Sequence, residues 1–216
     1  MQLNVDRARW AWETLAYVLT HLRRHFNFNV WVINTRDFRP DMSPADEHLN
    51  RFQFRKLSDD DMQAACSDPD LPIDSQFAEG AQVRGDIGYG AFDGARLVGY
   101  TWKTTKPGPV DQGLSIRLIV PNINYGFKTF VHPAYRGHQL QDSVNHVGEK
   151  ECFDKGFFKN LSYVDMGNLS SLKSQYKSPT RTVVGFAGYW KVGSRFFTWR
   201  SPGARRHFQF HRDEAG

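Results

Sequence analysis

The chain has 216 residues, a length that suits one domain with an appendage or at most two small domains. Hydrophobic residues make up 40% of it and aromatic residues 14%, enough for a sizeable core, which excludes a globally disordered protein. The formal net charge of +5 is mildly basic. It suits a phosphate-bearing ligand or a polyanionic surface, although solubility alone also explains it.

The sequence carries no metal or membrane signature. Cys66 and Cys152 are its two cysteines and form no CxxC pair, which excludes a disulfide framework and a cysteine-based zinc site. HExxH and clustered carboxylates are missing as well, so we expect no metal. No stretch approaches the ~20 apolar residues that span a bilayer, so we expect no transmembrane segment. A reducing cytosol suits this cysteine content, and we expect a cytoplasmic protein.

Residues 1–50 have the pattern of an appendage made of a helix, a strand and a linker. Apolar residues recur at helical spacing from 6 to 25, with Asp6 as the candidate N-cap. This helix either packs on the domain or contacts a partner or a membrane surface. Residues 28–33 are typical of an extra strand, and residues 35–50, with Pro40 and Pro44, are typical of a linker.

A core domain is predicted from 51 to 200, and its first half reads as a strand, two helices and a hairpin. Residues 52–57 alternate apolar and polar side chains, as a half-buried strand does. Ser58 and the three aspartates after it are an N-cap signal for a helix that ends near Cys66, and a second helix is expected over 74–83. Asp93-Gly94 is a hairpin dipeptide between strands 87–92 and 96–101.

The second half of the core alternates strands with helices. After a loop at 103–113 we expect strands at 114–120 and 123–131, a helix at 138–154, a strand at 161–166, a helix at 169–177 and strands at 182–190 and 195–199. Residues 201–216 form a basic tail that we expect to be frayed. Because this order mixes hairpins with one β-α-β unit, it predicts an α+β fold with a mixed α/β sheet.

The stretch from Thr129 to Leu140 predicts an anion site. A strand ends at Pro133, turns through Arg136 and Gly137, and leads directly into a helix. The first N–H groups of a helix are unpaired and its dipole places roughly half a positive charge there, while Arg136 adds a permanent cation. The sequence therefore predicts a phosphorylated ligand at this turn.

Four segments in chain order resemble the GNAT superfamily of N-acetyltransferases, over about residues 51–200. Residues 55–61 are similar to its opening strand and first helix, and residues 92–100 to its central hairpin. Residues 130–137, Phe-Val-His-Pro-Ala-Tyr-Arg-Gly, are similar to its V.P.yRG signature, and residues 168–174 to its N..S..S segment. The resemblance implies an acyl-CoA cleft where the strands 123–131 and 161–166 splay apart.

The resemblance also implies which residues contact the cofactor. Backbone groups at Phe130 and Val131 would pair with the pantetheine amides. The implied pyrophosphate contacts are Arg136, Gly137, His138, Gln139, Leu140 and Gln141, and the further contacts are Asn168 and Ser171. The family pattern is Arg/Gln-x-x-Gly-x-Gly/Ala, so Gln139 and Gln141 replace the two small residues that let phosphate approach the backbone. A weakened or relocated CoA site is left open.

Acyl transfer from a thioester to an amine needs a neutral amine, a donor for the oxyanion and a proton for the leaving thiolate. The family spacing puts a tyrosine acid at Gln175, one residue before Tyr176. Since one residue turns a helix by about 100°, Tyr176 is the acid only if this segment is irregular. His132 is a candidate base and Asp165 a candidate for orienting a cationic acceptor. All three also suit ordinary surface or packing positions.

We therefore expect an acyl-CoA-dependent N-acyltransferase, most simply an N-acetyltransferase, that uses acetyl-CoA or another acyl-CoA and a small-molecule amine. One alternative is an N-acyl amino acid synthase-type enzyme that takes a long acyl chain from an acyl carrier protein. Another is a non-catalytic binding module, whose arginine-rich and aromatic tail would touch nucleic acid or anionic lipid. The charge is too modest to predict specific nucleic-acid binding, and a homodimer is left open.

Overall fold

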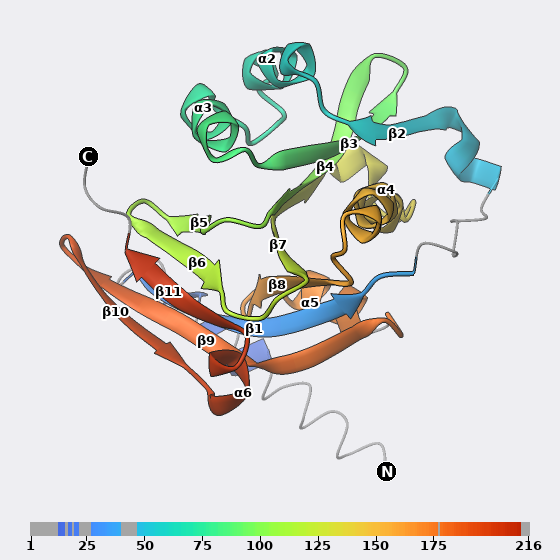
Figure 1. Cartoon of the computed structure of the whole chain (residues 1–216). Helices are drawn as coiled ribbons and strands as arrows, with labels where there is room; N and C mark the ends of the chain where they lie inside the picture. The colour runs from blue at the N-terminus through green and yellow to red at the C-terminus, as the bar shows by residue number, and fades with distance from the viewer. Residues whose placement is uncertain are drawn as a thin grey trace. The chain divides into compact units, whose positions relative to one another are not determined.

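The computed structural model describes residues 13–15, 17, 18, 20, 21, 27–39, 47–176 and 178–212 (Figure 1). Its contacts divide the chain into two compact units. Unit 1 comprises Met1–Arg36, Val110–Val120 and Leu161–Gly216, and unit 2 comprises Asp37–Pro109 and Pro121–Asn160. The domain boundaries expected at residues 50 and 200 stay a prediction.

Unit 2 contains an antiparallel sheet in the order β7-β4-β3-β2. Its strands are β2 (Phe52–Lys56), β3 (Ile87–Asp93), β4 (Arg96–Thr104) and β7 (Ile123–Val131), close to the predicted bounds. The predicted hairpin is confirmed, but its two loop residues are Gly94 and Ala95, because Asp93 still pairs with Arg96. Gly94, at φ 60°, is the loop residue with the left-handed backbone, which glycine adopts without strain.

Helices cover both faces of this sheet: α2 (Asp59–Ser67) and α3 (Ser75–Arg84) lie on one side and α4 (Leu140–Asp154) on the other (Figure 1). Phe77 of α3 packs edge-on against Trp102, with ring centroids 5.1 Å apart. On the α4 side, a Cβ at Gly148 would lie 2.8 Å from Tyr89, so only glycine allows this approach. The buried core on this side comprises Leu49, Phe52, Tyr89, Ala91, Val98, Leu140 and Val144. Two 3-10 turns, η1 (Glu47–Arg51) and η2 (Pro133–Tyr135), complete the regular structure of unit 2.

The larger sheet of unit 1 has the order β10-β9-β1-β8. Its strands are β1 (Phe28–Asp37), β8 (Lys159–Asp165), β9 (Arg181–Val192) and β10 (Arg195–Arg200). The strand predicted at 28–33 runs further than expected, into the predicted linker, because it pairs with β9 as far as Arg36. Trp31 stacks on Tyr163 at 4.2 Å between centroids, and α5 (Leu169–Tyr176) buries Leu172 against Val32 and Val164.

The expectation of a frayed tail was wrong for residues 202–212. Pro202–Arg205 form the short helix α6, and β11 (Phe208–Arg212) pairs with β6 (Leu114–Leu118). The alternation of Phe208 and Phe210 with polar residues explains this, since Phe208 is fully buried and Phe210 packs 6.1 Å from Trp31. A further short strand, β5 (Gly108–Asp111), lies in the predicted loop at 103–113.

The described part of the N-terminal segment agrees with the predicted helix. Residues 13–15, 17, 18, 20 and 21 are helical. The candidate cap Asp6 and residues 40–46 of the predicted linker lie outside the described residues. Among the described helices, none is long and apolar enough to cross a membrane. Helices and antiparallel strands occur together in both units, which confirms the predicted α+β class.

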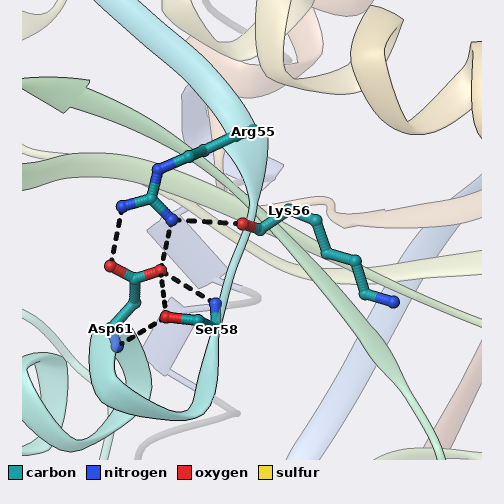
Figure 2. Close-up of polar contacts among 4 residues, drawn as sticks. All are labelled: Arg55, Lys56, Ser58 and Asp61. Atoms are coloured by element: carbon teal, nitrogen blue, oxygen red, sulfur yellow. Dashed lines mark hydrogen bonds and ion pairs between the residues drawn. The ribbon is translucent and has the colours of Figure 1, made fainter.

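A fully paired polar cluster joins α2 to β2 (Figure 2). The predicted N-cap is confirmed as a capping box: the Asp61 N–H donates to Ser58 Oγ at 3.2 Å, and the Ser58 N–H donates to Asp61 Oδ2 at 2.8 Å. Arg55 donates from both ends of its guanidinium to the Asp61 carboxylate, one bond measuring 2.8 Å, whereas the Lys56 side chain points away. The Arg55 hydrogen bond holds the pKa of Asp61 well below its usual range.

We expect Asp61→Asn to lower the free energy of unfolding by about 1–2 kcal/mol at pH 7, since it weakens the cap and removes the ion pair. The depressed pKa means that this contribution is present above the unfolded pKa of about 4 and is lost as the pH falls through the folded value. The stability difference should therefore shrink below about pH 4 in urea unfolding curves. Asp60→Asn, which removes a charge from the same turn but no Arg55 contact, is the control. A difference that does not change with pH would contradict the prediction.

Candidate functional site

The residues predicted for the site fall into one group in each unit. Unit 2 holds Phe130, Val131, His132, Arg136, Gly137, His138, Gln139, Leu140 and Gln141. Unit 1 holds Asp165, Asn168, Ser171 and Tyr176. The strands of the predicted cofactor cleft, 123–131 and 161–166, thus belong to different units, and the cleft stays a prediction.

In unit 2, the turn from β7 into α4 exposes backbone donors. α4 begins after Gln139, whose side chain makes no capping hydrogen bond. The N–H groups of Gly137, Gln139, Leu140 and Gln141 have no acceptor among the residues that the structure describes. The dipole of a 15-residue helix adds to these donors. The predicted concentration of N–H groups is therefore present at this helix start.

Arg136 adds its charge to the same turn. Its Nε donates to the Val131 carbonyl at 3.3 Å, which directs the side chain back along β7. The arginine is exposed, and in the described part of the chain the ends of its guanidinium have no carboxylate partner. Phe130, one residue before Val131, is half-buried and stacks on Tyr100 with centroids 5.5 Å apart. Arg136 is thus available to an anionic ligand.

The two positions where the motif departs from the family differ in conformation. Gln139 has φ 55°, in the left-handed region that favours glycine, and its side chain is exposed. The backbone at Gln139 therefore has a conformation that glycine adopts without strain, and the glutamine adopts it at a cost of roughly 1 kcal/mol or more. Gln141 lies in the first turn of α4 and is half-buried. Asp142, in the same turn, places a negative charge where an anion would bind.

His132 makes contacts that suit a structural role better than that of a base. Its Nδ1 accepts the Ala134 N–H at 3.2 Å, capping η2, and its Nε2 lies 3.7 Å from Asp70 Oδ2. Because Nδ1 accepts a hydrogen bond, the proton of the neutral ring is on Nε2. The ring also meets Tyr135 edge-on at 5.7 Å. His132 thus fixes the entry into the turn.

In unit 1, the predicted residues after β8 build the turn into α5. Asp165 Oδ1 accepts the Gly167 N–H at 2.8 Å. Asn168 Oδ1 accepts the Ser171 N–H at 3.1 Å and the Ser170 hydroxyl at 3.0 Å, which caps α5. The Asn168 oxygen is thus used locally, while its exposed amide nitrogen remains a donor that no described residue engages.

Tyr176 is the last residue of α5 and its side chain is 63% exposed. It lines a pocket of about 60 Å³ within unit 1, together with Val32, Asn34, Leu172, Gln175, Arg181 and Val183. Gln175, the position given by the family spacing, and Tyr176 are therefore both in the wall of this pocket. No described acceptor takes a hydrogen bond from the Tyr176 hydroxyl, which leaves it able to donate a proton.

Our prediction from the sequence missed Asn34 and Arg181, two polar residues that line this pocket together with Tyr176. Arg181 Nη1 donates to Asn34 Oδ1 at 3.0 Å, and the Ser162 hydroxyl donates to the same oxygen at 2.9 Å. One signal was present in the sequence, since Asn34 directly follows the apolar strand residues 30–33. In the structure Asn34 is buried like them, with 2% of its surface exposed. A polar residue that continues a buried strand indicates a hydrogen-bonded position.

No family model matches the sequence, and no curated protein matches it. Solved structures match its fold. A tandem GNAT protein from the clavulanic acid biosynthesis pathway matches with a TM-score of 0.51 at 15% identity, over 81% of this chain and 54% of that one. A Drosophila protein matches with a TM-score of 0.53 at 12% identity, over 78% of this chain and 52% of that one. A GNAT-family acetyltransferase from Novosphingobium aromaticivorans matches with a TM-score of 0.48 at 17% identity, over 74% of this chain and 61% of that one.

The chain therefore spans 52–61% of the length of these three structures. The tandem GNAT protein has the fold that the four sequence motifs predicted, and the similarity covers most of this chain. With the antiparallel strands, the N-capped first helix and the strand-turn-helix at Arg136 all present, the chain has the fold of the GNAT acetyltransferases.

Proposed function

We propose that the protein is an N-acyltransferase that moves an acyl group from an acyl-CoA thioester to a primary amine. The observation that carries this proposal is the start of α4, where four backbone N–H groups without an acceptor and the exposed Arg136 lie within six residues, in a chain of GNAT fold. Such a combination of donors and positive charge is what a pyrophosphate requires. Acetyl-CoA is the simplest acyl donor that carries such a pyrophosphate.

The reaction makes one bond and breaks another. The neutral amine attacks the thioester carbonyl carbon, a C–N bond forms and the C–S bond breaks. The nitrogen loses a proton to solvent, and the thiolate gains one. We assign the second proton to the Tyr176 hydroxyl and the pyrophosphate contacts to residues 136–141. Asn168 and Ser171 are proposed to contact the pantetheine, and Asp165 to orient the amine. His132 is assigned to positioning the turn, because its Nδ1 is engaged.

A carrier-protein donor is the second candidate. The left-handed Gln139 and the charge of Asp142 both weaken a phosphate site at the start of α4. A donor that adds contacts through a carrier protein would depend less on that site. In the tail, Phe196 and Phe208 are buried and Arg212 donates to the Phe196 carbonyl at 2.8 Å, so these residues give no support to a nucleic-acid site, whereas Phe197 and Trp199 are exposed.

We expect Arg136→Ala to weaken acetyl-CoA binding about 10- to 100-fold in calorimetry, since it removes charge-assisted hydrogen bonds worth roughly 1.5–3 kcal/mol. Arg117→Ala, which removes an exposed arginine from β6, is the matched control and should bind like the wild type. Equal affinity of Arg136→Ala and the wild type would show that the phosphate contacts are elsewhere.

The left-handed conformation at residue 139 can be tested with two variants. Gln139→Gly and Gln139→Ala both remove the side chain, but only glycine adopts φ 55° without strain. We expect Gln139→Gly to be about 1 kcal/mol more stable than Gln139→Ala in denaturant unfolding, and to bind acetyl-CoA at least as tightly as the wild type. If the alanine variant is as stable as the glycine variant, residue 139 is not left-handed.

The assignment of Tyr176 predicts a rate effect without a binding effect. Tyr176→Phe should lower the rate of thiol release from acetyl-CoA about 100-fold or more with an accepted amine, because a general acid contributes at least that much. Its affinity for acetyl-CoA should not change, since the hydroxyl acts only in the transition state. The assay is free-thiol detection across a panel of primary amines, with Tyr17→Phe as the control. An unchanged rate would remove Tyr176 from the mechanism.

A further inference from the structure

We infer that the pocket beside Tyr176 is a carboxylate subsite, and that the acceptor of the proposed transfer is an amine that carries a carboxylate, as an amino acid does. The second part rests on the proposed function. The first part rests on a buried hydrogen-bond donor without a partner, on the charge of the pocket and on its size.

The unpartnered donor is the side-chain amide of Asn34. An arginine only donates hydrogen bonds, so the Asn34 atom that faces Arg181 at 3.0 Å is Oδ1. The Ser162 hydroxyl donates to the same oxygen, which leaves Nδ2 turned away from both groups. Nδ2 is buried and has no acceptor among the described residues. A buried donor left in this state costs about 1–3 kcal/mol, which a ligand oxygen would offset.

The charge of the pocket favours an anionic oxygen. Among the described residues that line the pocket, Arg181 is the charged one, and its charge is positive. Gln175 and Tyr176 supply further polar groups, while Val32, Leu172 and Val183 form apolar walls. Low-dielectric walls strengthen the attraction between a guanidinium and an anion. Arg181 binds the Asn34 oxygen through Nη1, and its positive charge acts on an anion in the pocket without a direct hydrogen bond.

The size of the pocket limits what enters. The pocket has a volume of about 60 Å³, and a water molecule needs about 10–15 Å³ of a cavity measured in this way. The pocket therefore accommodates about four to six atoms of water size. A carboxylate with its α-carbon and one substituent fits, whereas an acyl chain or a sugar ring does not. Phosphate is of similar size, but it presents four oxygens to a pocket whose walls are largely apolar. A carboxylate presents two, which suit the Asn34 amide and the Arg181 charge.

The position of Tyr176 connects the pocket to the proposed reaction. Tyr176 lines the pocket at the end of α5, and its hydroxyl is the proposed acid. An amine one carbon away from a carboxylate held at Asn34 lies in the same pocket as Tyr176. The carboxylate subsite would therefore select α-amino acids from the range of primary amines.

The test begins with binding in the absence of any acyl donor. L-alanine should bind the wild-type chain in calorimetry and shift the Asn34 side-chain amide signal in NMR spectra. L-alaninamide and ethylamine, which lack the carboxylate, should bind at least about 10-fold more weakly, because they leave Nδ2 without an anionic acceptor. Equal binding of alanine and alaninamide would overturn the inference, and so would displacement of alanine by equimolar inorganic phosphate.

Asn34→Asp is the decisive variant, since it keeps the oxygen for Arg181 and Ser162 and replaces the donor with a second, negatively charged oxygen. We expect it to keep its thermal unfolding midpoint within a few degrees and to lose alanine binding at least about 10-fold. Asn50→Asp, at an exposed position in unit 2, adds the same charge elsewhere and should bind alanine normally. If Asn34→Asp proves unstable, Arg181→Gln should give the same loss of binding. Alanine binding that neither variant changes would refute the subsite.

Thiol release from acetyl-CoA then separates the two proposals. Both proposals are supported if thiol release is faster with alanine than with alaninamide and if the release with alanine slows in the Asn34→Asp variant. Release with amines regardless of a carboxylate would refute the acceptor class while the acyltransferase stands. Alanine binding through Asn34 without thiol release from acetyl-CoA or longer acyl-CoAs, with any amine, would refute the transferase and leave only the carboxylate subsite.

Discussion

The left-handed turn between β7 and α4 is the constraint on which the proposed chemistry depends. The chain passes from β7 through η2 into α4 within nine residues, and Gly137 at φ 87° and Gln139 at φ 55° supply the change of direction before the helix. The N-cap residue Gln139 makes no capping hydrogen bond with its side chain, so the first N–H groups of α4 remain available. An ordinary Ser or Asp cap would have consumed one of these donors and stabilised the helix instead. The protein thus forgoes stability where we propose that a ligand binds.

Local patterns were sufficient for most of the fold. The capping signal at Ser58 and the alternation in residues 52–57 each depend on neighbours in the chain, and both elements form where expected. The errors arose where pairing with a distant strand decides whether a segment is a strand. β1 continues beyond the expected residue 33 because β9 lies beside it, and residues 208–212 are a strand because β6 is their partner. A partner strand far away in the sequence leaves no local signal, so propensity alone assigned these residues to a linker and a tail.

The candidate site also contains residues that local sequence predicts and residues that depend on distant strand pairing. The turn at Arg136 was predictable because all of its parts lie within ten residues, and the cap at Asn168 because a capping residue acts within one helical turn. The pair Asn34 and Arg181 was not, since 147 positions separate two residues that meet only through the pairing of β1 with β9. Gln139 shows a third case. The sequence identified its departure from the family motif, but only the backbone shows that the position keeps the glycine conformation.

Polar groups in this protein fall into two classes that indicate different roles. In the cluster of Arg55, Ser58 and Asp61 every carboxylate oxygen has a donor, and the arrangement joins a helix to a strand. At the start of α4 and at Asn34 the donors have no acceptor. A satisfied cluster gains nothing from a ligand, whereas an unsatisfied donor loses stability until a ligand arrives. Such costs persist mainly where function requires them. This difference places Asp61 in the scaffold and supports the proposed ligand contacts at residue 139 and at Asn34.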